Sequence, residues 1–417
     1  MGATELAVWA VALAAAAGVL ARPFGWPEAV WAVAGALILL ASGLLPVRAG
    51  LAAVGKGLDV YLFLTGMMLL SEVARREGLF DWAAAKAARH ARGDPRRLFL
   101  LIYAVGVVVT TFLSNDATAV VLTPAVFAVA RAADAEPEPY LFICAMIANA
   151  ASFVLPISNP ANLVLYGAHV PALGAWLASF ALPSAAAILA TYLVLARVEG
   201  RALAASQAHD IRQPPLSPGG ATALAGICAA AVALIAVSAA GQALGLPTCL
   251  LGAATAGLVL VRKKEAPWAV LKGVSWSVMP LVAGLFVLVE ALDRTGLAAG
   301  LGRALAGAAA TSVAGAAAGG AAVLALACNL VNNLPAGLLA RATLAQAHPP
   351  QKVVDALLIA VDLGPNLAIT GSLATILWLT AIRREGERIG FWRFLRTGAL
   401  VMPPALIAAV AARLALG

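Results

Sequence analysis

The sequence predicts an all-α integral membrane protein made of two inverted-topology repeats, each with a re-entrant hairpin and a discontinuous helix. Three observations predict this fold. The chain of 417 residues is 62% hydrophobic and only 12% charged, whereas soluble domains average about 25% charged residues. Several apolar runs reach the roughly 18 residues that a helix needs to cross a bilayer. The two halves of the chain also repeat a set of residues in the same order.

About ten apolar segments are predicted to cross the membrane as full spans. The first has no basic segment ahead of it and carries Glu5 near its start. It is therefore predicted to be a retained span and not a cleaved signal peptide. The predicted spans are residues 3–21, 28–45, 58–74, 139–168, 174–196, 220–240, 246–261, 275–292, 353–382 and 393–415.

Two further apolar stretches, residues 98–130 and 312–345, are interrupted by polar residues at their centres. The first is broken at residues 114–116 in "FLSNDATAVVLTP", and the second at residues 332–333 in "NNLP". Backbone that unwinds at mid-depth must be buried in protein or line a water-filled cavity. We therefore predict that each stretch is a re-entrant hairpin, which enters and leaves on one side of the membrane.

The distribution of charge supports this topology. With the N-terminus outside, about three quarters of the 28 lysines and arginines fall in inner loops. Such a bias is the positive-inside rule, and it would be lost if either broken stretch crossed the membrane fully. We therefore predict a multi-pass protein of the cytoplasmic (inner) membrane with both termini outside. The net charge of +8 has the same explanation, so no nucleic-acid partner is predicted.

The two halves match at a nearly constant offset. The segment "TGMMLLSEVARREGLFDW" in the first half resembles "AGLFVLVEALDRTGLAAG" in the second, and Asn115-Asp116 matches Asn332-Asn333. Each half holds five spans and one hairpin, and an odd number of crossings inverts the second copy. The predicted division is a first repeat (1–196), a polar cytoplasmic linker (197–219) and a second, inverted repeat (220–417).

Glu72 and Glu290 occupy matching positions near the ends of two spans. Each is followed four residues later by an arginine, Arg76 or Arg294. Side chains four residues apart meet on the surface of a helix. We therefore predict two ion pairs within helices at the membrane boundary.

Each half contains two breaks, and together they predict one binding site. Inverted repeats with broken helices are typical of secondary transporters, whose site lies where the repeats meet. The breaks are "SNDAT", "LPISNPANL", "NLVNNLPAG" and "DLGPNLAITGSLAT". Their amides, hydroxyls and unwound backbone suit a small polar solute. For any one of these side chains, the alternative is a bond to nearby backbone. The predicted substrate-binding residues are Ser114, Asn115, Asp116, Thr118, Ser158, Asn159, Asn162, Asn329, Asn332, Asn333, Thr370, Gly371, Ser372 and Thr375.

Two carboxylates lie within these breaks. An ionised carboxylate at the centre of a bilayer costs roughly 2.5–3.5 kcal/mol. Asp116 and Asp362 must therefore face a polar cavity or hold a proton. We predict that both are proton-coupling residues. The alternative is that each caps a half-helix, a role that is compatible with proton coupling.

Outside the breaks, the sequence contains few residues in patterns that indicate a disulfide, a metal site or catalysis. The four cysteines are scattered without the spacing of a disulfide framework or a zinc site, and no cofactor or metal is predicted. Cys328 stands beside Asn329 and is a candidate thiol contact to a soft metalloid; the alternative is a packed apolar cysteine. No phosphate-binding loop and no Ser/His/Asp cluster is present, so the chain is predicted not to be an enzyme and not to hydrolyse ATP.

The break motifs resemble those of the ion transporter superfamily, which includes dicarboxylate, citrate and sodium/proton carriers. Within it, "FLSNDATAVVLTP", "NNLP" and "DLGPNLAITGSLATILWL" are most similar to arsenite efflux permeases of the ArsB type. The resemblance implies a secondary active exporter of arsenite and antimonite that works by proton antiport and alternating access. It also implies that some members dock a soluble arsenite-stimulated ATPase on the cytoplasmic face. It leaves the oligomeric state open.

Alternative functions remain open at this point. The first is a sodium/proton antiporter or another anion carrier of the same superfamily, and a passive channel is the competing class. A dicarboxylate substrate would meet Asp116 as a like charge, which is unfavourable. Arsenous acid is neutral and carries three hydroxyls, so it needs only hydrogen-bond partners.

Overall fold

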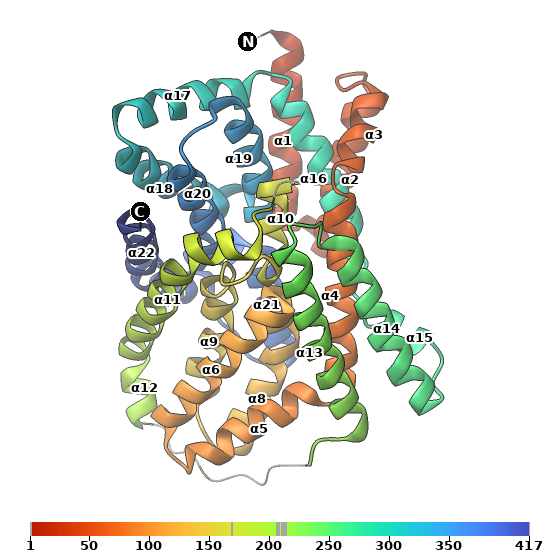
Figure 1. Ribbon diagram of the computed structural model, residues 1–417, viewed down its shortest axis with the longest axis vertical. Coiled ribbons are helices and arrows are strands. Elements are labelled where there is room, and N and C mark those ends of the chain that lie inside the picture. The colour runs from red at the N-terminus through yellow and green to blue at the C-terminus, as the bar shows by residue number, and fades with distance from the viewer. Residues whose placement is uncertain (1, 168–169, 206–208, 210–214, 417) are drawn as a thin grey trace.

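The computed structural model is helical throughout the part of the chain that it describes, which is every residue except 1, 168–169, 206–208, 210–214 and 417 (Figure 1). No strand occurs among the described residues. Alanine and leucine, which are strong helix formers, dominate the apolar runs. A helix also satisfies its own backbone groups, as a lipid environment demands. The prediction of an all-α membrane protein is confirmed.

The chain forms the same series of elements twice. The first series is α1 (Ala3–Ala21), η1 (Pro23–Gly25), α2 (Glu28–Ala41), α3 (Val47–Gly55), α4 (Leu58–Arg76), α5 (Leu79–Ala91), α6 (Pro95–Leu113), α7 (Asn115–Ala117), η2 (Thr118–Leu122), α8 (Thr123–Ala132), α9 (Pro137–Ala150), η3 (Pro156–Ser158), α10 (Pro160–Tyr166) and α11 (Leu173–Val198). After α12 (Gly200–Ala205) come α13 (Pro218–Ala239), α14 (Gly245–Lys263), α15 (Trp268–Leu271), α16 (Val278–Asp293), α17 (Leu297–Thr311), α18 (Val313–Val331), α19 (Asn333–Ala347), α20 (Gln351–Leu363), η5 (Gly364–Asn366), η6 (Ile369–Gly371), α21 (Leu373–Arg384) and α22 (Phe391–Ala415).

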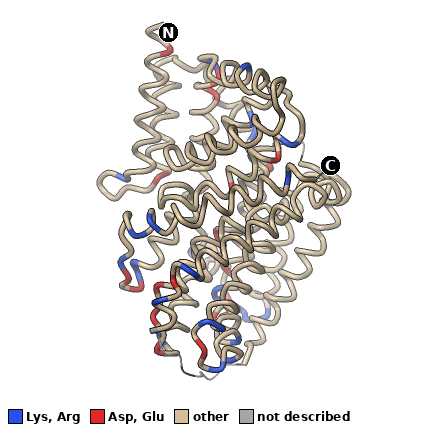
Figure 2. The backbone as a smooth tube through the Cα atoms, turned by 90° about the vertical axis from the view of Figure 1, so that its left-hand side faces the viewer, with Lys and Arg blue, Asp and Glu red and all other residues tan. Residues whose placement is uncertain are grey.

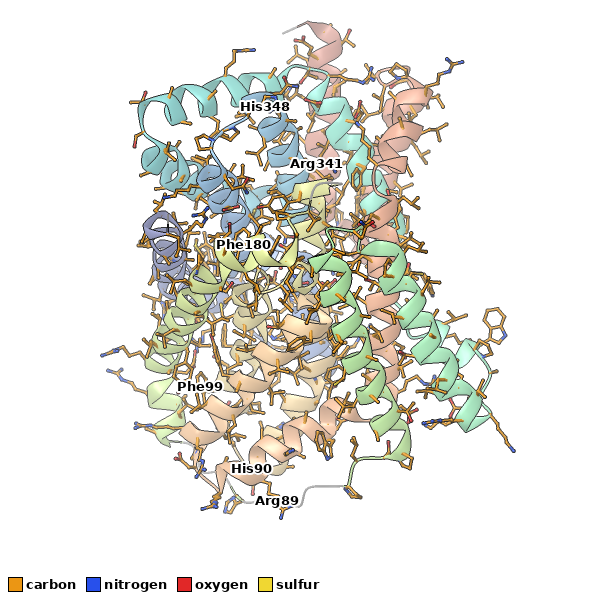
Figure 3. All side chains as sticks on the ribbon, in the orientation of Figure 1. Arg89, His90, Phe99, Phe180, Arg341 and His348 are labelled. Atoms are coloured by element: carbon orange, nitrogen blue, oxygen red, sulfur yellow. The ribbon has the colours of Figure 1, made fainter. Side chains whose placement is uncertain are left out.

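The two series are inverted relative to each other. Helix α5 lies at one end of the molecule and its counterpart α17 lies at the other, as Figure 1 shows. Figure 3 marks the same two ends, with Arg89 and His90 of α5 at one end and His348, which follows α19, at the other. The inverted-topology prediction is confirmed. The exact boundaries of the repeats remain a prediction, and residues 206–208 and 210–214 of the predicted linker lie outside the described part.

Seven of the described helices are long and apolar enough to cross a membrane, or eight if the bent pair α3 and α4 counts as one span. Two of the seven, α6 and α18, are arms of the predicted hairpins and were not counted among the ten predicted spans. Of those ten, α2 and α16 are short, with 14 and 16 residues, and α4 qualifies only together with α3. The predicted spans 139–168 and 353–382 are also interrupted at their breaks, so no single helix of theirs reaches spanning length.

Both predicted hairpins are present. Helix α5 packs against α6 and against α8, so both arms of the first hairpin have an end on the α5 side. In the same way, α17 packs against both α18 and α19. The turns fall at Ser114, with φ 111°, and at Asn332, with φ 74°. Positive φ is strained for a residue with a side chain, and such strain collects at functional sites.

Helices α5 and α17 themselves were not among the predicted elements. They have 13 and 15 residues and lie across the two ends of the molecule (Figure 1). A search for long apolar runs misses such helices because they are short and carry charged or small residues. They nevertheless position the site, because each supports the arms of one hairpin.

The core between the discontinuous helices is aromatic. Trp378 of α21 packs against Phe142 of α9 and Phe394 of α22, with ring centroids 5.9 and 5.5 Å apart. The Trp378 indole also donates a 3.0 Å hydrogen bond to the Leu141 carbonyl. These buried contacts fix the second discontinuous helix against the first.

The helices α4 and α14 cross at unusually short range. A Cβ atom on Gly66 would lie 2.1 Å from the Thr248 carbonyl oxygen, and one on Gly252 would lie 2.4 Å from the Gly66 carbonyl oxygen. Small residues let membrane helices approach in this way. The crossing joins a helix of the first series to a helix of the second.

Charged side chains gather at the α5 end of the molecule, as Figure 2 shows. The opposite end carries fewer of them, and the middle of most helices carries almost none. This pattern leaves a largely apolar belt for the bilayer, as expected of a membrane protein.

Candidate functional site

The four breaks meet in the centre of the fold. The first hairpin packs through α6 against η3, and through its turn helix α7 against α21. The second hairpin packs through α18 against η5 and η6. Each hairpin therefore contacts a break in a discontinuous helix, and the residues predicted for the site come from neighbouring elements.

The tip of the first hairpin is built around Asn115 and Asp116. Asn115 is buried, and its Oδ1 has no hydrogen-bond donor within the described part of the chain. The Thr118 hydroxyl lies 2.7 Å from the Thr110 hydroxyl on the opposite arm. The return arm begins with a π-helical turn, η2. Such turns are rare and are frequent at functional sites.

A cavity of about 700 Å³ reaches this tip. Its inner wall includes Ser114, Asp116 and Pro160. Asp116 therefore faces a cavity that has other charged residues on its wall, an arrangement that tolerates a carboxylate within a membrane. The charged residues on the cavity wall are Glu72, Arg75, Asp81, Asp116, Lys272, Arg384 and Glu385.

Asp362 lies in a different environment. Its side chain is fully buried, and it is not among the residues that line the cavity. Its Oδ1 accepts a 2.7 Å hydrogen bond from Asn159 Nδ2 of the first repeat. Its Oδ2 has no donor within the described chain. Of the two predicted proton-coupling residues, Asp116 therefore lines the cavity, whereas Asp362 is enclosed by protein.

Asn162 presents another free acceptor. Its Nδ2 points at the carbonyl oxygens of Ser152, Pro156 and Leu155, at 2.9, 3.3 and 3.4 Å. The amide nitrogen is therefore held by backbone, and the buried Oδ1 is left without a donor. Buried acceptors without partners are uncommon in native proteins and call for a ligand or another explanation.

Asn329 connects the second hairpin to the second break. Its Nδ2 donates to the carbonyls of Ala325 and Gly364, and its Oδ1 accepts from the Ala368 amide at 2.9 Å. The Thr370 hydroxyl donates to the Asn329 carbonyl at 2.8 Å. Asn329 and Thr370 are thus bonded to backbone, and their part in substrate binding remains a prediction.

Three predicted residues cap the half-helices that start at the breaks. The side chains of Asn159, Asn332 and Ser372 accept hydrogen bonds from the first turns of α10, α19 and α21. Thr375 completes the Ser372 cap and also donates to the Ile369 carbonyl at 2.8 Å. The caps fix these helix N-termini, whose free N–H groups and dipoles suit electronegative ligand atoms.

The other predicted residues lie close around these caps. Ser158 donates a 3.0 Å hydrogen bond to the Thr111 carbonyl and so joins the first break to its hairpin. Asn333 is buried at the second hairpin tip. A side chain at Gly371 would collide with Pro365, since a Cβ there would lie 2.4 Å from the Pro365 Cα.

The structure adds two residues that the sequence analysis did not select. Asn149 Nδ2 donates a 2.9 Å hydrogen bond to Asn366 Oδ1, and Asn366 Nδ2 donates at 2.9 Å to the Met146 carbonyl. The Ser372 hydroxyl lies 3.4 Å from Asn149 Oδ1. Asn149 is the last-but-one residue of α9, as Asp362 is of α20, and this match between the repeats would have identified Asn149.

Cys328 is buried and lies next to Asn329 in the first arm of the second hairpin. Its role as a thiol contact remains a prediction. Among the described residues, no group of three or more histidine, cysteine, aspartate or glutamate side chains is placed to hold a metal ion.

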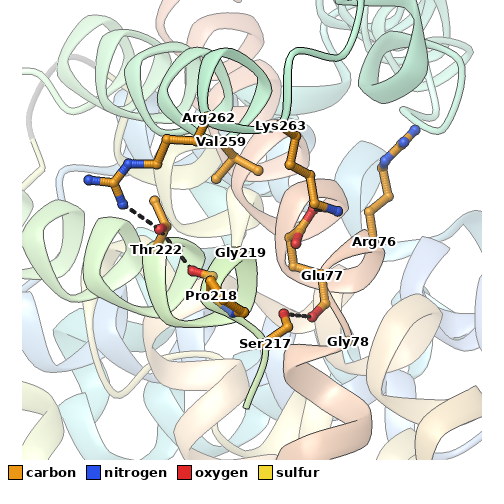
Figure 4. Close-up of a pocket in the computed structure, with 10 residues that line it drawn as sticks. All are labelled: Arg76, Glu77, Gly78, Ser217, Pro218, Gly219, Thr222, Val259, Arg262 and Lys263. Atoms are coloured by element: carbon orange, nitrogen blue, oxygen red, sulfur yellow. Dashed lines mark hydrogen bonds and ion pairs between the residues drawn. The ribbon is translucent and has the colours of Figure 1, made fainter.

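A second pocket, of about 500 Å³, lies where the end of α4 meets the start of α13 (Figure 4). Lys263 pairs with Glu77 at 2.7 Å, and Arg262 donates to the Thr222 hydroxyl at 2.7 Å. Ser217 donates to the Glu77 carbonyl at 3.0 Å. These charged and polar groups already bind one another, so this pocket joins helices and is a poor candidate for the substrate site.

One of the two predicted helix ion pairs is confirmed and the other is wrong. Glu290 pairs with Arg294 at 3.1 Å. Glu72 instead pairs with Arg75, through two hydrogen bonds of 2.7 Å. Arg76 points away and pairs with Glu265 at 2.8 Å, because α14 and the α15 segment lie beside the end of α4.

Relatives with known names match most of the chain. An arsenical pump membrane protein of Yersinia enterocolitica is 30% identical over 361 residues, which cover 83% of this chain and 83% of that protein. The arsenical pump membrane protein of Escherichia coli K12 is 27% identical over 367 residues, with 83% of each chain covered. An uncharacterised transporter of Mycobacterium bovis is 26% identical over 355 residues, with 82% of each covered.

Two solved transporters share the fold. The YdaH transporter of Alcanivorax borkumensis superposes with a TM-score of 0.56 over 88% of this chain and 86% of its own, at 17% identity. MtrF of Neisseria gonorrhoeae, described as one of a class of antimetabolite efflux pumps, gives a TM-score of 0.56 over 92% and 85%, at 13% identity. These likenesses concern the fold alone.

The family follows from the sequence match. The model of the CitMHS citrate transporter family matches residues 6–364 of this chain. The matched family and its structural neighbours are transporters and efflux pumps, not enzymes. The chain is therefore a multi-pass membrane transporter that belongs to the CitMHS citrate transporter family, within the ion transporter superfamily.

Proposed function

We propose that this transporter exports arsenite and antimonite from the cell in exchange for protons, by alternating access. The observation that carries the proposal is the position of Asp116, which the tip of the first hairpin holds on the wall of the 700 Å³ cavity. A carboxylate at that position can gain or lose a proton in contact with water on one side of the membrane. The second carboxylate, Asp362, is enclosed and is the other proton-coupling candidate.

The free acceptors around the breaks suit a neutral polyhydroxyl substrate. Asn115, Asn162 and Asp362 each have a buried side-chain oxygen without a donor. Arsenous acid offers three O–H groups and no charge, so it can donate to such oxygens. Citrate would bring several carboxylates towards Asp116, and like charges in a site of low dielectric repel strongly. The family name therefore does not decide the substrate.

The proton cycle follows from the same geometry. Loss of a proton from Asp116 on the cytoplasmic side frees acceptor oxygens and favours loading of a hydroxyl-bearing substrate. Protonation from outside turns one of these acceptors into a donor and favours release. The resulting exchange of substrate for protons uses the inward proton gradient to drive export.

We further propose the cytoplasmic membrane as the location, with the α5 end inside and both termini outside. The gathering of lysine and arginine at the α5 end (Figure 2) supports this orientation by the positive-inside rule. A soluble arsenite-stimulated ATPase, which the family resemblance implies for some members, would bind at this same end. Transport driven by protons does not require it.

The test is arsenite uptake into everted membrane vesicles with an imposed inside-acid pH gradient and no ATP. The expected result is accumulation above the outside concentration that collapses when a protonophore is added. Vesicles with the Asp116→Asn variant at equal abundance are the matched control and should not accumulate arsenite. Movement of sodium in place of arsenite would assign cation exchange instead, and downhill equilibration alone would assign a channel.

A further inference from the structure

A lysine and a glutamate from opposite repeats form an ion pair on one side of the molecule. Lys56 Nζ lies 2.7 Å from Glu290 Oε2. Lys56 stands at the bend between α3 and α4, where the two helix axes differ by 45°. Glu290 stands less than one turn before the end of α16. The pair therefore ties the bend of the first repeat to the second repeat.

The inverted counterpart of this pair exists but is not formed. Lys272 and Gly273 follow α15 as Lys56 and Gly57 follow α3, and Glu72 matches Glu290. A Cβ on Gly273 would lie 1.8 Å from Glu72 Oε1, so the glutamate carboxylate packs against the residue next to the lysine. Within the described part of the chain, Lys272 nevertheless has no ion-pair partner within 4.0 Å.

Each glutamate also has an arginine on its own helix. Arg294 holds Glu290, and Arg75 holds Glu72. The lysine from the other repeat is thus an additional partner, which can be gained or lost without leaving the glutamate unpaired. Such a partner suits a contact that forms in one conformation and breaks in another.

The unformed pair lies on the open cavity. Glu72, Arg75 and Lys272 all line its wall. Neither Lys56 nor Glu290, which form the other pair, lines this cavity. Glu72 lies near the end of α4 that leads into α5, and Glu290 near the end of α16 that leads into α17, and these two ends are opposite (Figure 1). The cavity therefore lies on the side of the molecule where the lysine–glutamate pair is absent. The corresponding pair on the opposite side is formed.

We propose that the two lysine–glutamate pairs are alternating latches. Lys56–Glu290 stabilises the conformation in which the cavity is open at the α5 side, and Lys272–Glu72 stabilises the opposite one. Both sets of residues come from repeat-related positions, so the same contact closes either side. This inference rests on the proposed alternating access and adds to it the residues that set the balance between its two end states.

The size of the effect follows from the exposure of the pair. Side chains of Lys56 and Glu290 are 55% and 17% exposed, and exposed pairs are weak. Loss of one latch should therefore shift the equilibrium between the two conformations only about two- to fivefold. The shift should have opposite signs for the two latches, because each stabilises a different end state.

The experiment measures how often the cavity is open, without any substrate. Ser275→Cys places a reporter thiol on the cavity wall. The exposed Cys228 and the half-buried Cys249 are replaced by serine, and the buried Cys144 and Cys328 stay. The rate of labelling by a membrane-impermeant maleimide is then compared with and without the latch variants, in vesicles that expose the α5 side.

Lys56→Gln should lower the labelling rate by at most the two- to fivefold shift of the equilibrium, because the rate follows the open fraction, while the matched Lys272→Gln should not lower it. Lys56→Arg, which keeps the positive charge opposite Glu290, should retain the parent rate, and this control separates a latch from a folding defect. Equal labelling of Lys56→Gln and the parent would overturn the proposal. Because the readout needs no arsenite, failure of the proposed substrate would leave this result intact.

Discussion

Asn149 and Asn366, which come from the two discontinuous helices, are hydrogen-bonded to each other at 2.9 Å in the centre of the transporter. Asn149 ends the first half of one discontinuous helix, and Asn366 follows the first half of the other. The amide pair therefore fixes the distance between the two breaks. Both residues are fully buried, so neither can exchange its partner for bulk water.

The first prediction concerns this pair. Asn149→Leu removes the donor and leaves the Asn366 oxygen buried without a partner, at a cost of about 1–3 kcal/mol. Asn366→Leu should cost about the same. We expect the double variant to lose less than the sum of the two, because neither orphaned amide remains. Unfolding midpoints of the purified transporter in detergent measure this double-mutant cycle, and strict additivity would contradict the coupling.

The second prediction separates proton coupling from binding at Asp116. Asp116→Asn keeps the size and the acceptor oxygen of the side chain but cannot carry a proton. We expect it to abolish accumulation driven by a pH gradient and to retain exchange of labelled for unlabelled arsenite, which moves no net protons. Asp116→Glu should keep part of the gradient-driven uptake. If Asp116→Asn still accumulates arsenite on a pH gradient, the proton is carried elsewhere, and Asp362 becomes the candidate.

The third prediction concerns the contact between Asn159 and Asp362 at 2.7 Å. Asn159→Ser keeps a side chain that can cap α10 but removes the amide that donates to Asp362. A hydrogen bond to a charged group contributes roughly 1.5–3 kcal/mol, so transport should fall about ten- to a hundredfold. In an Asp362→Asn background the same change should have little further effect. Initial uptake rates of the four proteins at equal abundance test this, and a full second loss would show that Asn159 acts independently of Asp362.

The fourth prediction tests the crossing of α4 and α14. Gly66→Ala places a methyl group against the Thr248 carbonyl, and such overpacking costs about 1–3 kcal/mol. Gly257→Ala is the matched control on α14, because a Cβ there meets no atom within 4 Å. The control should be neutral or slightly stabilising, since alanine favours helix over glycine by about 1 kcal/mol. Thermal unfolding in detergent compares the two, and equal midpoints would show that the helices can separate at no cost.

The breaks in the helices could be predicted from the sequence, but several of the elements that surround them could not. Polar residues at 114–116 and 332–333 and the prolines of the two discontinuous helices interrupt apolar runs, so composition alone locates them. Helices α5 and α17 carry no such signal. They are too short to cross a bilayer, so a search for spans passes over them although their alanine content favours helix.

The candidate site, too, could be predicted from the sequence only in part. Residue type predicted Asn159 and Asp362 as polar groups of the breaks, but their mutual contact joins residues 203 positions apart. The predicted pair of Glu72 with Arg76 was wrong for two reasons. Helix spacing permits partners three residues apart as well as four, and Arg75 binds Glu72. Glu265, which follows α14, binds Arg76. Asn149 was missed because it lies one turn before the visible break and looks like any polar residue in an apolar helix.

The contacts between the two discontinuous helices follow the symmetry of the repeats. Asn149, the last-but-one residue of α9, lies 3.4 Å from the Ser372 hydroxyl at the N-cap of α21, and Asp362, the last-but-one residue of α20, accepts a hydrogen bond from Asn159 at the N-cap of α10. A two-fold axis repeats every contact that crosses it. The same contact is therefore made twice, once with a neutral amide and once with a carboxylate, and this difference makes the two halves of the centre chemically unequal.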